Sequence, residues 1–169
     1  ARSGGDLMAQ WYVLRLRRDL GAPMPPPRWP AGVTLKTLTA KPEKALVKAA
    51  HSVLEAGFWE GGGGAPIFRQ WWKAVSKDEE FDPALMFLAV DRDGVVGMAQ
   101  CWTSAFVKDL AVHPRARRRG IGGALMLAVF HEFARRGAPY VDLKVREENG
   151  NARALYHALG MTLVAREPG

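Results

Sequence analysis

The sequence lacks features that would place it in several large classes of protein. Cys101 is the single cysteine among 169 residues, so no disulfide can form within the chain, as is usual in a reducing compartment. No run approaches the ~18 consecutive apolar residues that a membrane span needs. The N-terminus also has no apolar secretory segment. We therefore expect a cytoplasmic protein that does not interact with a membrane.

Acidic residues are also scarce relative to basic ones, at 17 against 24, which gives a formal net charge of +7. A positive charge favours a polyanionic ligand, and a nucleotide cofactor, a nucleic acid or an acidic acceptor would all fit. The four histidines show no metal-ligand spacing, so we predict no metal site. Cys101 suits a buried core position better than a nucleophilic role.

The length of 169 residues predicts one domain with an N-terminal extension. Residues 1–7 precede Met8 and could be an expression-tag remnant. Trp11 to Arg17 alternates loosely, with Tyr12, Leu14 and Leu16 on one face, which predicts a short edge strand. The proline-rich segment 21–32 predicts a semi-rigid linker. We therefore divide the chain into an arm, residues 1–32, and a body, residues 33–169.

The body alternates short apolar runs with amphipathic segments. The order predicted is β-α-α-β-β-β-α-β-α-β, which is typical of an α/β domain with a mixed sheet. Asp91–Gly94 predicts a hairpin turn, 61–64 a flexible glycine loop, and 106–145 a right-handed parallel crossover. The predicted strands are 33–38, 85–90, 95–102, 105–112, 140–145 and 161–165, and the predicted helices are 41–56, 66–77, 124–136 and 151–159.

A glycine-rich turn, Arg117–Gly123, joins a predicted strand to a predicted helix. Its three glycines let the backbone approach a ligand closely, and the helix start offers free N–H groups and a positive dipole end. This pattern predicts a site for a phosphorylated cofactor. A Walker loop would need a Lys-Ser/Thr pair where Gly123-Ala124 stands, and a dinucleotide fingerprint would need a glycine at Leu125.

A wider set of residues resembles the GNAT superfamily of acetyl-CoA-dependent N-acyltransferases. The set comprises Val112, Arg117-x-x-Gly120-x-Gly122, Asn149, Ala152, Tyr156 and Gly160-Met161. The resemblance covers the chain from about Val33 onward and implies a single domain with a mixed, splayed sheet flanked by helices. It also implies acetyl transfer from acetyl-CoA to a primary amine of a small-molecule or peptide acceptor, by direct attack and without a metal.

The resemblance further implies roles for individual residues. Backbone N–H groups of the glycine-rich turn would hold the pyrophosphate of coenzyme A, and the preceding strand would pair with the pantetheine arm and hold the oxyanion. Tyr156 would protonate the leaving thiolate as general acid. The implied cofactor-binding residues are Leu110, Ala111, Val112, Arg117, Arg118, Arg119, Gly120, Ile121, Gly122, Gly123 and Asn149.

The general base and the acceptor stay open at this point. Many members of the superfamily have a glutamate where Phe106 or Lys144 stands here. Asp109, Glu60 or a water relay are the alternatives for removing the proton from an ammonium group. The residues expected near the acceptor are Trp59, Glu60 and Trp102.

Other functions are compatible with parts of the sequence. The missing glutamates would suit a sensor or interaction module that binds coenzyme A without efficient catalysis. The arginine run would suit a nucleic acid, but the neighbouring glycines explain the same arginines, so we do not expect that partner. Many relatives have one more strand beside the last predicted one. The arm, a swapped segment or a second subunit could fill that edge, and a homodimer is one expectation.

Overall fold

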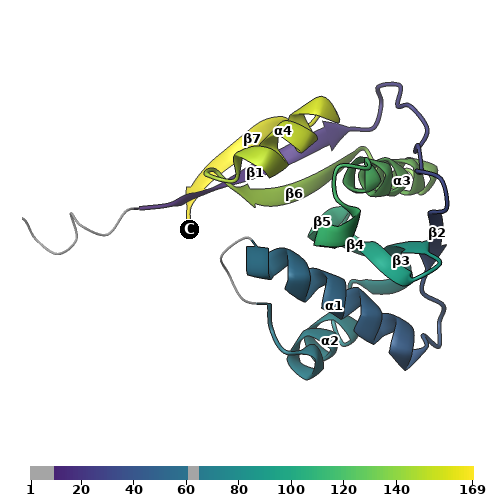
Figure 1. Cartoon of the computed structure of the whole chain (residues 1–169). Coiled ribbons are helices and arrows are strands. Elements are labelled where there is room, and N and C mark those ends of the chain that lie inside the picture. Colours follow the sequence, from purple (N-terminus) through teal and green to yellow (C-terminus); the bar gives the residue numbers. More distant parts are fainter. Residues whose placement is uncertain (1–9, 61–64) are drawn as a thin grey trace, which may run out of the picture.

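The computed structural model describes residues 10–60 and 65–169, with the side chains of residues 58–60 left out (Figure 1). In this part of the chain, seven strands form one sheet in the order β2-β3-β4-β5-β6-β1-β7. Helices α1 and α2 cover one face of the sheet, and α3 and α4 cover the other (Figure 1). The elements are β1 (Tyr12–Asp19), β2 (Thr34–Thr37), α1 (Lys44–Glu60), α2 (Phe68–Ser76), β3 (Phe81–Asp91), β4 (Gly94–Trp102), β5 (Phe106–Val112), the 3-10 turn η2 (Pro114–Ala116), α3 (Ile121–Arg135), β6 (Tyr140–Arg146), α4 (Gly150–Ala158) and β7 (Thr162–Pro168).

The predicted fold class is confirmed. From β2 onward the elements follow the predicted order, and the sheet is mixed, because β2 to β5 are antiparallel whereas β5 and β6 are parallel. Asp91 and Gly94 pair across the predicted hairpin turn. The predicted glycine loop 61–64 lies outside the described residues. No helix in the described ranges is long and apolar enough to cross a membrane.

Strand β1 lies inside the sheet, where it pairs antiparallel with β6 on one side and with β7 on the other. The predicted strand and its inward face are correct, since Leu14 and Leu16 are buried. The prediction of an edge strand was wrong. The strand has a partner on each side, and Arg15 and Arg17 on its other face bind the Asp142 carboxylate on β6. The arm therefore supplies a strand to this side of the sheet, while the division at residue 32 stays a prediction.

Helix α1 is longer than predicted and turned differently. It begins at Lys44 rather than Lys41 and continues to Glu60. Gly57 lies within the helix and does not end it. A Cβ at this position would lie 3.2 Å from the Ala111 Cβ on β5. The glycine permits close packing of α1 on β5. The sequence predicts one inward stripe of Leu46, Ala49, Ala50 and Val53. Ala50 and Val53 are buried, but Leu46 and Ala49 are only half-buried, and the other buried positions are Val47, His51 and Leu54.

The other helices pack as their periodicity predicts. The apolar spacing of α3 predicts that Ile121, Leu125, Ala128, Val129 and Phe133 face inward, and all five are buried. Gly137, with φ of 84°, follows the end of the helix. A Cβ on Gly97 of β4 would lie only 2.9 Å from Ile121 Cγ2, so the first turn of α3 lies directly on β4. This contact fixes where the start of α3 meets the sheet.

The sheet splays between its two central strands. Strands β5 and β6 pair only through Phe106 with Asp142 and Val107 with Leu143. Gln100 pairs with Asp109 and Cys101 with Val107, which leaves Lys108 as the extra residue of a β-bulge in β5. The splay is therefore present beside the predicted strand. We name the point where β5 and β6 separate, formed by the pairs Phe106–Asp142 and Val107–Leu143, the fork.

Candidate functional site

The candidate site extends along β5 from the fork to the start of α3. In the described chain, β5 has no β6 partner from Lys108 to Val112. Leu110 and Val112 pack on the α3 side and Ala111 on the α1 side, so the edge that faces the gap is backbone. An unpaired strand edge can form main-chain hydrogen bonds to an extended ligand. The structure thus brings the three predicted strand residues to this edge.

The glycine-rich turn has the backbone geometry of an anion site. Gly120, with φ of 76°, precedes α3, and Arg118, with φ of 61°, is also left-handed. Among the described side chains none caps this helix, and its first turn has no acidic residue. The N–H of Ala124 bonds to the Gly120 carbonyl. The N–H groups of residues 121–123 precede the first such bond, so they are the donors that a helix start offers to an anion.

Two arginine side chains, one before the turn and one within it, attach the turn to its surroundings. Arg115 donates two hydrogen bonds to Asp91, at 2.9 and 3.2 Å, which fixes the segment to the β3–β4 hairpin. The hydrogen bond from Arg115 holds the pKa of Asp91 below its usual range. Arg119 donates to the Ala31 carbonyl at 3.3 Å and so contacts the linker. All three arginines of the turn, residues 117–119, are exposed.

Helix α4 and its N-cap supply the other two residues predicted near the cofactor. The Asn149 side chain accepts a hydrogen bond from the Ala152 N–H at 3.2 Å and therefore caps the helix. A Cβ on Gly122 would lie 3.5 Å from Leu155 Cδ2, so α4 contacts the start of α3. Burial of the neighbouring Tyr156 raises its pKa to about 12. Its hydroxyl consequently stays protonated and can donate a hydrogen bond at neutral pH.

Aromatic residues line the α1 and α2 side of the fork. Trp102 pairs with Phe106 across β4 and β5, and both side chains are half-buried. Trp59 and Glu60 lie in the last turn of α1, and their side chains are outside the described set. Of the three residues predicted near the acceptor, the structure therefore brings the Trp102 side chain to the fork.

Asp109, one of the predicted alternatives for the base, lies on the same side beside the bulge. Its Oδ2 accepts hydrogen bonds from Trp71 Nε1 at 3.2 Å and from Lys108 Nζ at 2.9 Å. Gln100 lies opposite in the register and is fully buried; within the described residues its Oε1 has no hydrogen-bond partner. Burial, with the charge of Asp109, raises the pKa of the Cys101 thiol far above its usual range, so a thiolate is disfavoured.

An ion cluster around a buried carboxylate at the fork was not predicted from the sequence. Asp142 Oδ2 accepts from Arg15 Nε at 2.7 Å, and its two oxygens accept from Arg17 Nε and Nη2 at 2.8 and 2.9 Å. Burial alone would raise the pKa of Asp142, but the hydrogen bonds from Arg17 and Arg15 outweigh it and hold the pKa below its usual range. The one sequence signal was the pair of arginines on one face of a strand, and it does not identify their partner.

The second position where the resemblance implies a glutamate also lies on this face. Lys144 is the Cα partner of Arg15, and its Nζ lies 3.2 Å from Glu167 Oε1 on β7. No group of three or more His, Cys, Asp or Glu side chains in the described ranges is arranged to hold a metal ion. The fork is therefore bordered by cations on the side opposite α3.

Comparison with known proteins relates this geometry to a family. The model of the acetyltransferase (GNAT) family matches residues 50–161. A mycothiol acetyltransferase of Thermomonospora curvata is 32% identical over 166 residues, covering 90% of this chain and 52% of the relative. Another from Salinispora arenicola is 34% identical over 161 residues, covering 86% of this chain and 50% of the relative. The chain thus spans about half the length of these curated relatives.

Solved structures similar to this chain are also N-acetyltransferases. A GCN5-related N-acetyltransferase from Sphaerobacter thermophilus has a TM-score of 0.77 at 28% identity, covering 94% of this chain and 50% of that one. The ribosomal-protein-S18-alanine N-acetyltransferase of Escherichia coli has a TM-score of 0.61 at 22% identity, covering 80% and 93%, and shares the fold. The chain belongs to the acetyltransferase (GNAT) family.

Proposed function

We propose that this chain transfers the acetyl group of acetyl-CoA to a primary amine of a small-molecule or peptide acceptor. The observation that carries the proposal is the unpaired edge of β5, Lys108 to Val112, which leads from the fork to the start of α3. An extended pantetheine arm needs a free strand edge, and a pyrophosphate needs helix-start N–H groups. Both requirements are met along one continuous segment. The name of the mycothiol acetyltransferases supports a small-molecule acceptor.

In this proposal the backbone does most of the cofactor binding. The N–H groups of residues 118–123 hold the pyrophosphate, and residues 110–112 pair with the pantetheine arm. A backbone N–H close to Leu110 polarises the carbonyl of the thioester, which is the activated acyl group that acetyl-CoA supplies. The Tyr156 hydroxyl, which its raised pKa keeps protonated, donates to the leaving sulfur. Asn149 holds the start of α4 beside the cofactor.

For the general base we propose Asp109 acting through a water molecule. Trp71 and Lys108 hold its carboxylate in one orientation beside the bulge. The unpartnered Oε1 of Gln100 has acceptor capacity directly across the β4–β5 register. A buried carbonyl oxygen of this kind normally binds a protein donor or an ordered water. Such a water could pass the proton of the ammonium group to Asp109.

Calorimetry with acetyl-CoA tests the proposed function at its first step. We expect one molecule to bind per chain, and no binding at tens of micromolar would contradict the proposal. Gly122→Asp should weaken binding about tenfold or more, because its carboxylate would repel a pyrophosphate at the helix start. Gly122→Asn is the matched control, since a Cβ there meets Leu155 at an ordinary distance of 3.5 Å. The Asn variant should lose much less affinity.

The alternative is a sensor or interaction module that binds coenzyme A. Phe106 and Lys144, which stand where the resemblance implies glutamates, favour this alternative. Release of free thiol from acetyl-CoA, measured with a panel of amines and peptides, separates the two functions. Amine-dependent thiol release supports acetyl transfer. Tight cofactor binding without thiol release across the panel would favour the sensor.

A further inference from the structure

We propose that Arg15 and Arg17 form an anion-binding subsite for the acceptor, so that the acceptor has a carboxylate or phosphate group near its reactive amine. The inference rests on the proposed acetyl transfer and names the substrate class of the same site. It follows from where the arm places the two guanidinium groups, from their unused hydrogen-bond donors, and from the charges around the fork.

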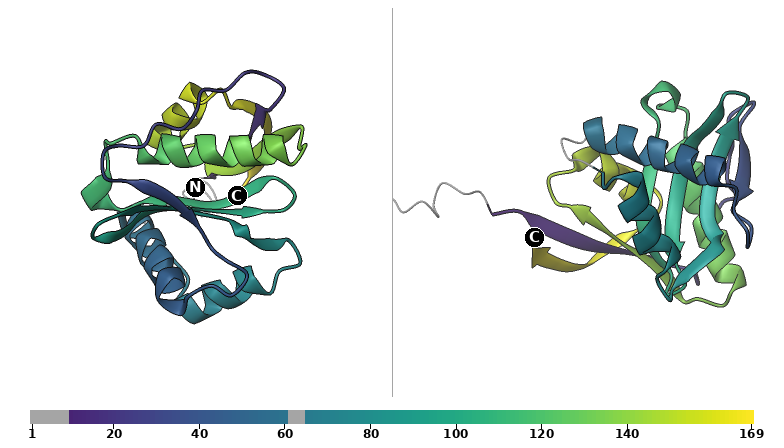
Figure 2. Two further views of the ribbon diagram at one scale, coloured as in Figure 1. Left: turned by 90° about the vertical axis from the view of Figure 1, so that its right-hand side faces the viewer. Right: turned by 90° about the horizontal axis from the view of Figure 1, so that it is seen from below.

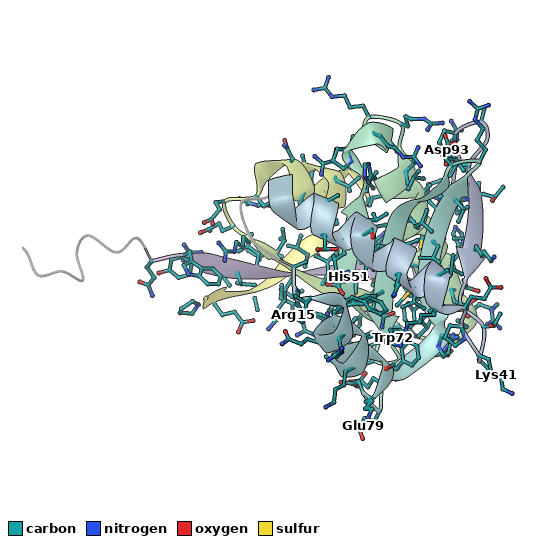
Figure 3. The ribbon with its side chains drawn as sticks, turned by 60° about the horizontal axis from the view of Figure 1, so that its bottom comes forward. Arg15, Lys41, His51, Trp72, Glu79 and Asp93 are labelled. Carbon is teal, nitrogen blue, oxygen red and sulfur yellow. The ribbon has the colours of Figure 1, made fainter. Side chains whose placement is uncertain are left out.

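The two arginines reach the fork from β1. The Arg15 guanidinium carbon lies 5.3 Å from the centroid of the Phe106 ring, and Phe106 pairs with Asp142 at the fork. The Arg15 side chain therefore extends across β6 to the residue where β5 and β6 begin to separate. Figure 3 looks toward this face of the sheet and labels Arg15. The reactive end of an extended cofactor bound along β5 would lie at the same point.

This part of the sheet is open on the side of the arginines. Seen from below in Figure 2, α1 and α2 lie across the β3 to β5 region, while β1 and β7 extend beyond them. The side chains of Arg15 and Arg17 are 37% and 34% exposed, whereas that of Asp142 is 2% exposed. An acceptor can therefore approach the guanidinium groups from solvent, while their anchor stays buried.

The guanidinium groups retain donors for a second anion. Each has five N–H donors, and Asp142 accepts one from Arg15 and two from Arg17. Both Nη atoms of Arg15 have no acceptor among the described residues. Asp142 holds the Nε ends in place, and Arg17 also stacks on Tyr140 with its guanidinium carbon 3.6 Å from the ring centroid. The remaining N–H groups are thus preorganised for the planar, bidentate recognition that suits carboxylate and phosphate.

The surrounding charges favour the same class of acceptor. Three cations, Arg15, Arg17 and Lys144, face two carboxylates, Asp142 and Glu167, which leaves one positive charge in excess. Phe106, which stands where the resemblance implies a glutamate, is uncharged and adds no negative charge to the fork. Positive charge attracts the anionic group of an acceptor and lowers the pKa of a nearby ammonium group, which favours the neutral amine that attacks. An acceptor with cationic groups alone would be repelled at this point.

Paired acceptors test the subsite. The pairs are β-alanine with β-alaninamide and phosphoethanolamine with ethanolamine, and each pair differs in the anionic group. We expect the wild-type protein to prefer the anionic member of one pair by about tenfold or more in kcat/KM, and that pair identifies carboxylate or phosphate. Arg15→Gln should raise KM for this anionic member about 10- to 100-fold and alter the kinetics of the neutral member much less, because only the amine pKa effect of the lost charge applies to it. Equal losses for both members would overturn the subsite.

Two further variants separate the subsite from general effects. Arg166→Gln removes the same charge from β7, but Arg166 pairs with Leu14 and so lies on the opposite face, where it binds Glu147. It should not alter the preference. Arg15→Lys keeps the charge but not the bidentate geometry, so it should fold and give an intermediate KM. Wild-type affinity for the anionic member in this variant would contradict bidentate recognition.

Binding measurements distinguish failure of the subsite from failure of acetyl transfer. Each acceptor is titrated by calorimetry into protein saturated with coenzyme A. Acetylation of amines without a preference for the anionic member would refute the subsite and leave acetyl transfer intact. If no amine is acetylated, acetyl transfer is refuted, and the subsite still predicts tighter binding of one anionic member. Equal binding or no binding within both pairs would refute it.

Discussion

The Asp142 cluster predicts a large and specific loss of stability when its carboxylate is neutralised. Asp142→Asn keeps the size of the side chain but replaces three charge-assisted hydrogen bonds by at most one or two weaker ones. The substitution also turns an amide N–H₂ toward two guanidinium groups that have only donors. Because these bonds join β1 to β6, the loss should weaken the attachment of the arm to the rest of the sheet.

The expected magnitude follows from the burial of the partners. Removing one partner of a fully buried ion pair costs about 3–5 kcal/mol of unfolding free energy. Here the carboxylate is buried, but the two guanidinium groups are about one third exposed and can be hydrated after the substitution. We therefore expect a loss of about 2–4 kcal/mol for Asp142→Asn. For a protein of this size, that corresponds to a fall in Tm of roughly 5–15 °C.

The order of the single variants tests the same reasoning. Arg15→Gln removes one hydrogen bond and leaves Asp142 paired with Arg17, whereas Arg17→Gln removes two and the contact with Tyr140. Both should cost less than Asp142→Asn, because a single remaining guanidinium still compensates the buried carboxylate. Between them, Arg17→Gln should cost more. Asp93→Asn is the control, since Asp93 is 69% exposed and its 4.0 Å ion pair with Arg92 should contribute nothing measurable.

The pH dependence supplies an independent check. The pKa of Asp142 is lower in the folded protein than in the unfolded chain, where a free aspartate has a pKa of about 3.9. The unfolded state therefore binds the proton first as the pH falls, so the stabilisation is complete above about pH 5 and is lost as the pH falls through the folded-state pKa. The stability difference between wild type and Asp142→Asn should be constant near neutral pH and shrink below about pH 4.

Denaturant unfolding, followed by circular dichroism from neutral to acidic pH, measures all of these quantities. A loss below about 1 kcal/mol for Asp142→Asn would refute the argument, because it would mean that the three hydrogen bonds do not compensate a buried charge. A loss for Arg15→Gln as large as that for Asp142→Asn would refute it in another way. It would show that the arginine stabilises the sheet through contacts other than the shared carboxylate.

Three other substitutions test the site. Tyr156→Phe should lower kcat about 100-fold with little change in acetyl-CoA affinity. Tyr140→Phe is the control and should leave kcat near the wild-type value. An unchanged kcat for Tyr156→Phe would exclude a hydrogen bond from Tyr156 to the leaving sulfur. Asp109→Asn should lower kcat and require a higher pH for activity, and a pH–rate profile like that of the wild type would exclude Asp109 as the base. Gly97→Ala should destabilise the fold by about 1–3 kcal/mol and weaken acetyl-CoA binding, because its Cβ would lie 2.9 Å from Ile121 Cγ2. Gly150→Ala, where a Cβ would have open space, is the control, and equal melting temperatures for the two variants would contradict the close contact.

The parts of the site that the sequence predicted are those that local geometry determines. Gly120 must adopt a left-handed conformation before α3, and glycine does so without strain. The apolar spacing of α3 fixes which of its faces lies on the sheet, and the inward residues that it predicts, from Ile121 to Phe133, are buried. The predicted turn and helix therefore follow from neighbouring residues. The same is true of the hairpin at Asp91–Gly94, whose turn residues pair Asp91 with Gly94 and Val90 with Val95.

The acceptor side could not be predicted in this way because it depends on strand order. Arg15 and Arg17 meet Asp142 only because β1 lies between β6 and β7, more than 120 positions away in sequence. An alternating strand with two arginines is equally compatible with an edge that faces water. Its partners are determined by the order of the strands in the sheet, which a local pattern does not specify.

The two halves of the proposed site therefore come from different parts of the chain, one from a local backbone segment and the other from side chains of a distant strand. The donor half lies on β5 and the start of α3, within the range matched by the family, and it needs mainly backbone N–H groups and room for them. The acceptor half includes guanidinium groups from β1, which precedes that range. A substitution in β1 can thus alter the charge at the fork without changing the cofactor segment. In that case a motif identifies the acyl donor, and the strand beside β6 determines which amines are accepted.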